Sequence, residues 1–73
     1  MEYNILLKKF GIKVKYLRLM NNMTQDNLAE KLKVDTHYLS DIERGRRNIS
    51  FKTMHKIASV LDVEPKVLFN FDH

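Results

Sequence analysis

Apolar side chains recur along this chain at steps of three and four residues, the spacing that gathers them on one face of an α-helix. A first helix is predicted over about residues 6–20, where one face carries Phe10, Val14 and Leu17. Asn21 and Asn22 mark its predicted end, because asparagine tolerates the left-handed backbone conformation of a helix stop.

The next two apolar segments are short, and about three residues separate them. Thr24 is a typical N-cap for the first segment, and Asp35 is one for the second. Gly45 ends the second segment, as glycine does in the position after a helix. The predicted inward-facing residues are Leu28, Ala29, Leu32, Val34, Leu39 and Ile42. Two short helices joined by a tight turn with an apolar residue are typical of a helix-turn-helix, although many helical hairpins share the pattern.

Two further segments complete the predicted fold. Ser50 is a typical N-cap for a fourth helix, whose apolar stripe is Met54, Ile57, Ala58 and Leu61. Pro65 suits the first position of a short last helix that extends to about residue 69. The sequence therefore predicts an all-α, compact five-helix domain over residues 1–73, with its core at about 6–70 and its helix-turn-helix at about 24–44.

Composition narrows the class of protein. The chain has 73 residues and no cysteine, which excludes disulfides and thiolate metal sites. No apolar run approaches the ~18 residues of a membrane span, and no signal-peptide pattern is present, so we expect a cytoplasmic protein without membrane contact. A net charge of +4 fits either a soluble surface or an anionic partner such as nucleic acid.

The basic charge is concentrated after the third predicted helix. Residues 42–56 carry one acidic side chain, Glu43, and five basic ones, which are Arg44, Arg46, Arg47, Lys52 and Lys56. A charge run can be a merely solvated surface. Its position beside a helix-turn-helix instead favours contact with DNA phosphates, which position a protein and supply much of its affinity.

The segment MTQDNLAEKLKVDTHYLSDIERGRRNIS resembles the Cro/repressor-type (XRE-like) helix-turn-helix regulators of bacteria and phages. The matching elements are Thr-Gln at 24–25, Leu-Ala at 28–29 and Ile-Glu-Arg-Gly at 42–45, and the resemblance covers about residues 8–70. Within the family, YLSDIERGRRNIS is most similar to the controller proteins of restriction–modification systems. Lys33 stands where the family usually has glycine, which matters little if that position is unstrained.

The resemblance implies a dimeric, sequence-specific regulator that binds a pseudo-palindromic double-stranded operator. It places base contacts on the outward face of the helix at about 36–44, at Thr36, His37, Tyr38, Ser40 and Asp41. Hydroxyl and imidazole groups can hydrogen-bond base edges, and a carboxylate can accept from a cytosine amino group. The alternatives are a merely polar outer face and, for Asp41, a carboxylate that orients an arginine.

A second set of residues is expected to contact phosphates. Gln25 lies in the first turn of its helix, where free backbone N–H groups favour an anion. The other members are Arg44, Arg46, Arg47, Asn48 and Lys52, of which the residues at 46–48 could also reach a base. The resemblance further implies a structural salt bridge between Arg18 and Glu43.

The C-terminal apolar cluster is expected to divide between the core and a dimer interface. Its members are Val67, Leu68, Phe69 and Phe71. A homodimer is expected because operators of this class consist of two half-sites. RNA polymerase is left open as a further partner.

No enzyme, cofactor or small-molecule ligand is expected. The histidines at 37, 55 and 73 lie eighteen residues apart and lack ligand spacing for zinc, and no catalytic set is recognisable. The alternative function is a protein-interaction module such as an antitoxin, with secondary DNA binding. Antitoxins usually add a toxin-wrapping tail, and this sequence ends soon after its last predicted helix.

Overall fold

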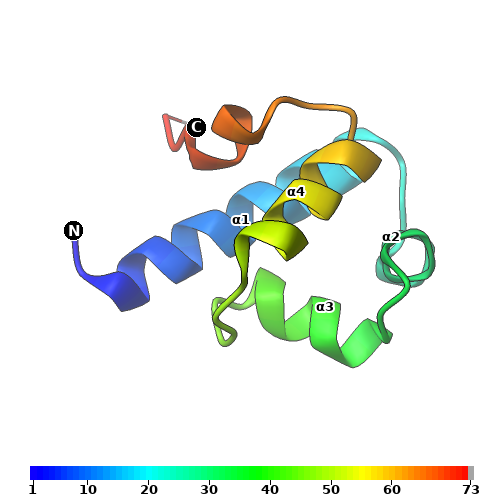
Figure 1. Ribbon diagram of the computed structural model, residues 1–73, viewed down its shortest axis with the longest axis horizontal. Coiled ribbons are helices and arrows are strands. Elements are labelled where there is room, and N and C mark those ends of the chain that lie inside the picture. Colours follow the sequence, from blue (N-terminus) through cyan, green and yellow to red (C-terminus); the bar gives the residue numbers. More distant parts are fainter. Residues whose placement is uncertain (73) are drawn as a thin grey trace.

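The computed structural model describes residues 1–72, so His73 lies outside the described residues. These residues form four α-helices and a terminal 3-10 helix, which are α1 (Tyr3–Met20), α2 (Gln25–Leu32), α3 (Thr36–Glu43), α4 (Phe51–Val60) and η1 (Pro65–Phe69). Figure 1 shows α1 extending through the length of the molecule, with α3 along its lower edge and η1 along its upper edge.

The prediction of an all-α fold is confirmed, but the fifth helix is a 3-10 helix. In this segment the N–H of Val67 donates to the carbonyl oxygen of Glu64 at 2.9 Å, and that of Asn70 donates to Val67 at 3.2 Å. Both bonds span three residues, which is the 3-10 pattern. A five-residue segment has room for very few bonds of the α-helical pattern, and short helical segments often adopt the tighter 3-10 form.

The helix starts follow the capping residues that the sequence predicted. The side chains of Thr24, Asp35 and Ser50 accept hydrogen bonds from backbone N–H groups three residues later, at 2.8–3.1 Å. At Thr24 the bond is reciprocal, because the Asn27 side chain accepts from the Thr24 N–H at 3.0 Å. Each cap satisfies donors that the first helical turn would otherwise leave unpaired.

The first helix begins at Tyr3, earlier than the predicted start near residue 6. Glu2, the residue before it, makes no side-chain capping bond. A tertiary contact holds this end instead, since the Tyr3 hydroxyl donates to Oδ1 of Asn48 at 2.7 Å. Apolar periodicity within residues 6–20 indicates which side of the helix is buried, but it does not reveal a contact with a distant residue. The predicted start near residue 6 was therefore wrong.

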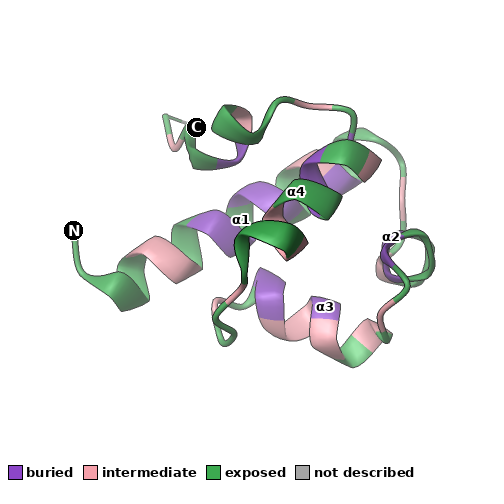
Figure 2. Ribbon diagram, viewed as in Figure 1, coloured by how far each residue is buried: buried purple, intermediate pink, exposed green. Residues whose placement is uncertain are grey.

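The core lies where α1, α4 and η1 meet the pair α2–α3, and its buried positions appear in Figure 2. Its members are Phe10, Val14, Leu28, Ala29, Leu32, Leu39, Ile42, Ile57, Ala58, Leu61 and Leu68. Nearly all of these positions lie on the faces that the apolar spacing predicted. Leu17 and Met54, which were also predicted to face inward, are partly buried at the edge of the cluster.

The turn between α2 and α3 holds one strained residue. Lys33 has a φ of 60°, in the left-handed region that favours glycine. The sequence made a small effect of this lysine conditional on an unstrained position, and that condition is not met. A side chain in this conformation costs about 1 kcal/mol relative to glycine. The position ends α2, and Val34 then donates its N–H to the carbonyl oxygen of Ala29 at 3.0 Å.

Candidate nucleic-acid interface

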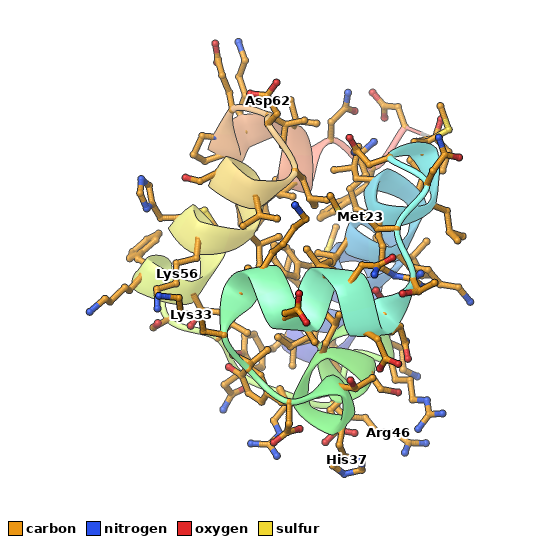
Figure 3. All side chains as sticks on the ribbon, turned by 90° about the vertical axis from the view of Figure 1, so that its right-hand side faces the viewer. Met23, Lys33, His37, Arg46, Lys56 and Asp62 are labelled. Carbon is orange, nitrogen blue, oxygen red and sulfur yellow. The ribbon has the colours of Figure 1, made fainter. Side chains whose placement is uncertain are left out.

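The recognition helix α3 presents a polar outer face that begins at its N-terminus. Of the five residues expected to contact bases, His37 is exposed and Thr36, Tyr38, Ser40 and Asp41 are partly buried. In Figure 3 the labelled side chains of His37 and Arg46 project from the same edge of the molecule. The start of α3 and the loop after it therefore share one surface.

A buried polar network fixes the C-terminal end of α3. Nε of Arg18 lies 2.7 Å from Oε2 of Glu43, and Nη2 donates to Oε1 at 3.0 Å. The two side chains are 7% and 3% exposed. The third nitrogen, Nη1, donates to the carbonyl oxygen of Met23 at 2.9 Å. Each guanidinium nitrogen thus has a partner, and the bidentate pair ties α1 to α3 and to the segment before α2.

Gln25 belongs to this network in the structure. Its Nε2 donates to Oε1 of Glu43 at 3.0 Å, so the side chain turns inward. The expectation placed the same amide against a phosphate on the outside. In the structure this amide donates to the carboxylate of Glu43 instead, because a buried charge is stable only when hydrogen-bond donors surround it.

Two glycines allow the end of α3 to approach α1. A side chain at Gly11 would overlap the carbonyl oxygens of Ile42 and Glu43. Gly45 has a φ of 73° and packs against the backbone of Lys8, and it ends α3 as the sequence predicted. The role of Gly11 was not predicted from the sequence, although a glycine inside a helical pattern often indicates such a close approach.

Arg47 is held against the outer face of α3. Its Nε lies 3.4 Å from Oδ2 of Asp41, and its guanidinium stands 5.0 Å from the centroid of the Tyr38 ring. Nε2 of His37 lies 3.8 Å from the same carboxylate oxygen. This outer cluster matches the alternative interpretation of Asp41, as a carboxylate that orients an arginine.

The hydroxyl of Thr36 is engaged within the protein. It donates to Oδ1 of Asp26 at 2.6 Å and so joins the start of α3 to α2. The oxygen keeps a lone pair that can accept a hydrogen bond from an adenine or cytosine amino group. The Thr36 hydroxyl thus donates one hydrogen bond within the protein and can still accept one from a base.

The loop after α3 carries the exposed basic residues. Arg44, Arg46, Arg47 and Lys52 are all exposed, and Asn48 is exposed while accepting the hydrogen bond from Tyr3. The Schellman geometry at the end of α3 sets the path of the loop, since the N–H of Arg46 donates to the carbonyl oxygen of Asp41 at 2.8 Å. The loop therefore leaves α3 in a defined direction with its cations outward.

The expected dimer cluster divides differently from the prediction. Leu68 is fully buried within the core of the protomer, so assigning it to a dimer interface is wrong. Val67 and Phe71 are partly buried. Phe69 is exposed on one side, and its ring packs against Phe10 with 5.5 Å between centroids.

Residues 1–72 hold no candidate metal site and no candidate membrane-spanning helix. There, no group of three or more His, Asp and Glu side chains is placed to hold a metal ion. None of the helices in this part of the chain combines the length and apolar character needed to traverse a bilayer.

Comparison with known families identifies the protein family to which this chain belongs. The helix-turn-helix family model HTH_3 matches residues 14–68. The chain therefore belongs to this family, and it is a DNA-binding transcriptional regulator of the helix-turn-helix class. The resemblance in the segment at 23–50 is thus confirmed.

Several individual proteins similar to this chain are control proteins. The chain is 46% identical over 63 residues to the control protein C.BamHI of Bacillus amyloliquefaciens, covering 85% of this chain and 78% of that protein. It is 35% identical to the control protein C.MunI of a Mycoplasma species, covering 85% of each. The crystal structure of the restriction–modification controller protein C.AhdI from Aeromonas hydrophila superposes with a TM-score of 0.83 at 40% identity, covering 86% of this chain and 96% of that one.

Proposed function

We propose that this protein is a dimeric, sequence-specific regulator that binds a pseudo-palindromic operator through α3 and controls a restriction–modification system. The observation that carries the proposal is the shared surface of the polar face of α3 and the arginine loop. The likeness to two control proteins and to a crystallised controller protein supports the subfamily. An antitoxin function has no comparable observation in its favour.

We assign base recognition to the polar groups on the outer face of α3. His37 and Ser40 offer short, directional hydrogen bonds, and Thr36 offers the lone pair that its bond to Asp26 leaves. Arg47 is the candidate for guanine, because a guanidinium matches O6 and N7 bidentately. Its contacts with Asp41 and Tyr38 already hold it on α3 and reduce the entropy lost on binding.

Phosphate contact is assigned to the remaining exposed cations. Arg44 and Arg46 follow α3, and Lys52 lies in the first turn of α4. Backbone N–H groups at a helix N-terminus add a favourable field for an anion. Asn48 is a further candidate, already oriented by Tyr3.

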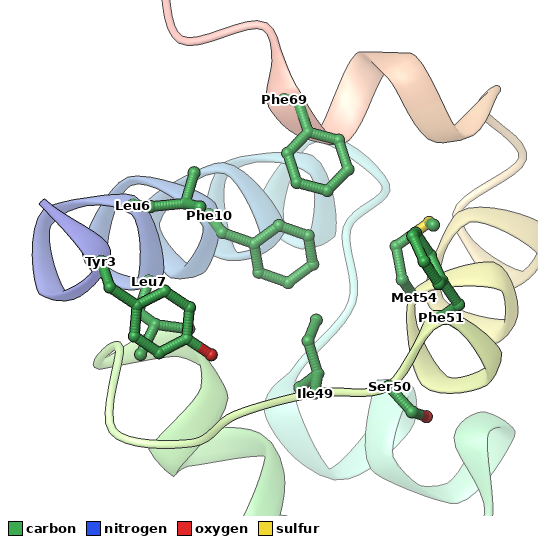
Figure 4. A pocket seen from close by; sticks show the side chains of 9 residues that line it. All are labelled: Tyr3, Leu6, Leu7, Phe10, Ile49, Ser50, Phe51, Met54 and Phe69. Atoms are coloured by element: carbon green, nitrogen blue, oxygen red, sulfur yellow. The ribbon is translucent and has the colours of Figure 1, made fainter. Parts of the chain in front are cut away.

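A two-fold dimer is proposed because one protomer carries one recognition helix and covers one half-site. Phe51 is 85% exposed and borders an apolar hollow lined by Tyr3, Leu6, Leu7, Phe10, Ile49, Met54 and Phe69 (Figure 4). In a two-fold dimer, the projecting Phe51 ring of each protomer can enter the hollow of the other. This is the self-complementarity that an isologous interface requires. We therefore move the dimer interface from Leu68 to this face and retain Phe69 in it.

Selection of bound duplexes from a random DNA pool tests the proposal. The expected product is an inverted repeat whose half-sites lie about one helical turn apart, ~34 Å centre to centre. Failure to enrich any sequence would contradict sequence-specific binding. Enrichment of a single half-site without its inverted copy would contradict the proposed dimer but not sequence-specific binding.

Sedimentation without DNA tests the interface separately. Phe51→Glu should shift the protein toward the monomer, whereas His55→Glu, a change at an exposed position of the same helix, should not. A Phe51→Glu protein that remains dimeric would place the interface elsewhere. RNA polymerase is proposed as a further partner if the protein activates as well as represses, which a promoter assay with the selected operator would reveal.

A further inference from the structure

The first helix has a second apolar stripe on the side opposite the core. Ile5, Ile12 and Leu19 are 45%, 63% and 54% exposed. They are seven residues apart, and seven residues return to nearly the same side of a helix, within about 20°. At 1.5 Å per residue the stripe extends for ~21 Å. We refer to these three residues as the outer stripe.

Basic side chains flank the outer stripe on both sides. Helical spacing places Lys8 and Lys15 along one side of it and Lys9 along the other. The helix has no acidic residue from Tyr3 to Met20. The charged side chains of α1 that flank the stripe are therefore all cationic.

Two of the cations are held in place by aromatic rings. Nζ of Lys9 lies 5.9 Å from the centroid of the Phe71 ring, and Nζ of Lys13 lies 5.4 Å from that of Tyr16. Cation–π contacts of this kind reduce the freedom of a long side chain. The Lys9 ammonium group therefore lies beside the stripe with reduced freedom, whereas Lys13 is only 6% exposed.

Ile12 stands between two surface hollows. One is lined by Lys9, Ile12, Lys13, Tyr16, Asn70 and Phe71. The other is lined by Lys8, Ile12, Glu43, Arg44, Gly45 and Arg46. A ridge with a hollow on each side is the surface that a second helix packs against, ridges into grooves.

We propose that the outer face of α1 binds an acidic amphipathic helix of a partner protein. The partner helix carries apolar residues at heptad spacing, which pack along the outer stripe, and Asp or Glu beside them, which pair with Lys8, Lys9 and Lys15. Charge complementarity selects this occupant, because opposite charges at both edges of a helix pair set partner choice and orientation. The proposal does not depend on the operator or on the dimer interface.

Two other occupants fit this face less well. A second copy of the face would bring lysines against lysines, and DNA phosphates offer no apolar counterpart for Ile12. Tyr16 and Met20, 42% and 64% exposed, lie beside the outer stripe on the same helix. A lipid surface is therefore tested directly as a competing occupant.

The test uses the full chain, labelled with ¹⁵N, and two synthetic three-heptad peptides with leucine at the a and d positions. One peptide has glutamate at e and g, and the matched peptide has lysine there. Titration with the glutamate peptide should shift the amide signals of α1 residues such as Ile12. The lysine peptide should bind at least tenfold more weakly.

Matched variants locate the contact. Ile12→Ser should weaken binding of the glutamate peptide about tenfold, since it removes the centre of the stripe. Lys66→Ser, a change at an exposed lysine outside α1, should leave that binding unchanged. Both sites are exposed, so both variants should fold.

Three results would overturn the proposal. Equal binding of the two peptides would remove the charge argument. Signal shifts confined to residues 44–52 would show simple attraction to the basic loop. Binding to vesicles that contain phosphatidylglycerol, without binding to the glutamate peptide, would assign the face to a lipid surface.

Discussion

An arginine faces a carboxylate at two places on α3, and the two pairs differ in burial. Within the protein, Arg18 and Glu43 lie 2.7 Å apart and are almost fully buried. On the outer face, Arg47 and Asp41 lie 3.4 Å apart, and their side chains are 47% and 15% exposed. Gln25 completes the inner pair, and the Tyr38 ring completes the outer one.

The difference in burial separates structure from recognition. A buried charge that loses its partner stays desolvated and unpaired, so the inner network is required for the fold. An exposed pair contributes only about 0–1 kcal/mol, because water and salt replace the partner at little cost. The outer pair can therefore exchange its internal contact for a base or a phosphate while α3 stays in place.

The largest expected effect is on the inner network. Glu43→Ala should lower the free energy of unfolding by ~3–5 kcal/mol, because Arg18 remains buried without a partner. A domain of this size has only about 4–11 kcal/mol of stability in total. Thermal melts followed by circular dichroism measure the loss. The matched variant Asp41→Ala should cost under ~1 kcal/mol, and equal losses in the two variants would contradict the comparison.

The next effect concerns the outer network and DNA. Arg47→Ala should weaken binding to the selected operator by ~1–3 kcal/mol, the value of one good base contact, while the melting temperature stays nearly constant. Titrations at several salt concentrations measure the affinity and its salt slope. A base contact predicts a loss of preference for operator over scrambled DNA. An equal loss on both DNAs, with a slope flatter by about one, would instead make Arg47 a phosphate contact.

The N-terminal end of α3 gives a third test. Thr36→Ala combined with His37→Ala should lower operator affinity about tenfold, roughly 1.4 kcal/mol, and leave binding to scrambled DNA almost unchanged. Because the Thr36 hydroxyl is bonded to Asp26, Thr36→Ala should also lower the free energy of unfolding by ~0.5–1.5 kcal/mol. His37→Ala alone is the control that should melt like the unaltered protein.

The smallest effect is in the turn that joins α2 to α3. Lys33→Gly should raise the free energy of unfolding by ~0.5–1 kcal/mol, because glycine adopts the left-handed conformation of this position without strain. Operator affinity should remain unchanged, as neither network includes Lys33. Denaturant titration detects a change of this size. A destabilised variant would mean that the lysine stem contributes more by packing than its backbone loses.

The elements that were predicted correctly depend on neighbours a few residues away. Thr24, Asp35 and Ser50 cap helices because their side chains reach an N–H three residues later. Gly45 ends α3 because glycine has the required backbone freedom. Such features follow from local geometry alone, as does the side of each helix that faces inward.

Three of the missed features depend on contacts between segments far apart in the chain. The start of α1 at Tyr3 depends on Asn48, and the inward turn of Gln25 depends on Glu43. The need for glycine at position 11 arises from the carbonyl groups of α3. Local periodicity carries no information on which distant group will lie opposite a given side chain.

The sequence by itself determined the helix order, the capping residues, the core faces and the family of this protein, because these follow from spacing and residue type. Only the tertiary structure decided that Leu68 is buried while Phe51 is exposed, since both belong to apolar segments at helical spacing. It also decided which arginine–carboxylate pair is buried. Burial depends on how the helices pack against each other, and packing sets whether a charge pair maintains the fold or remains available to DNA.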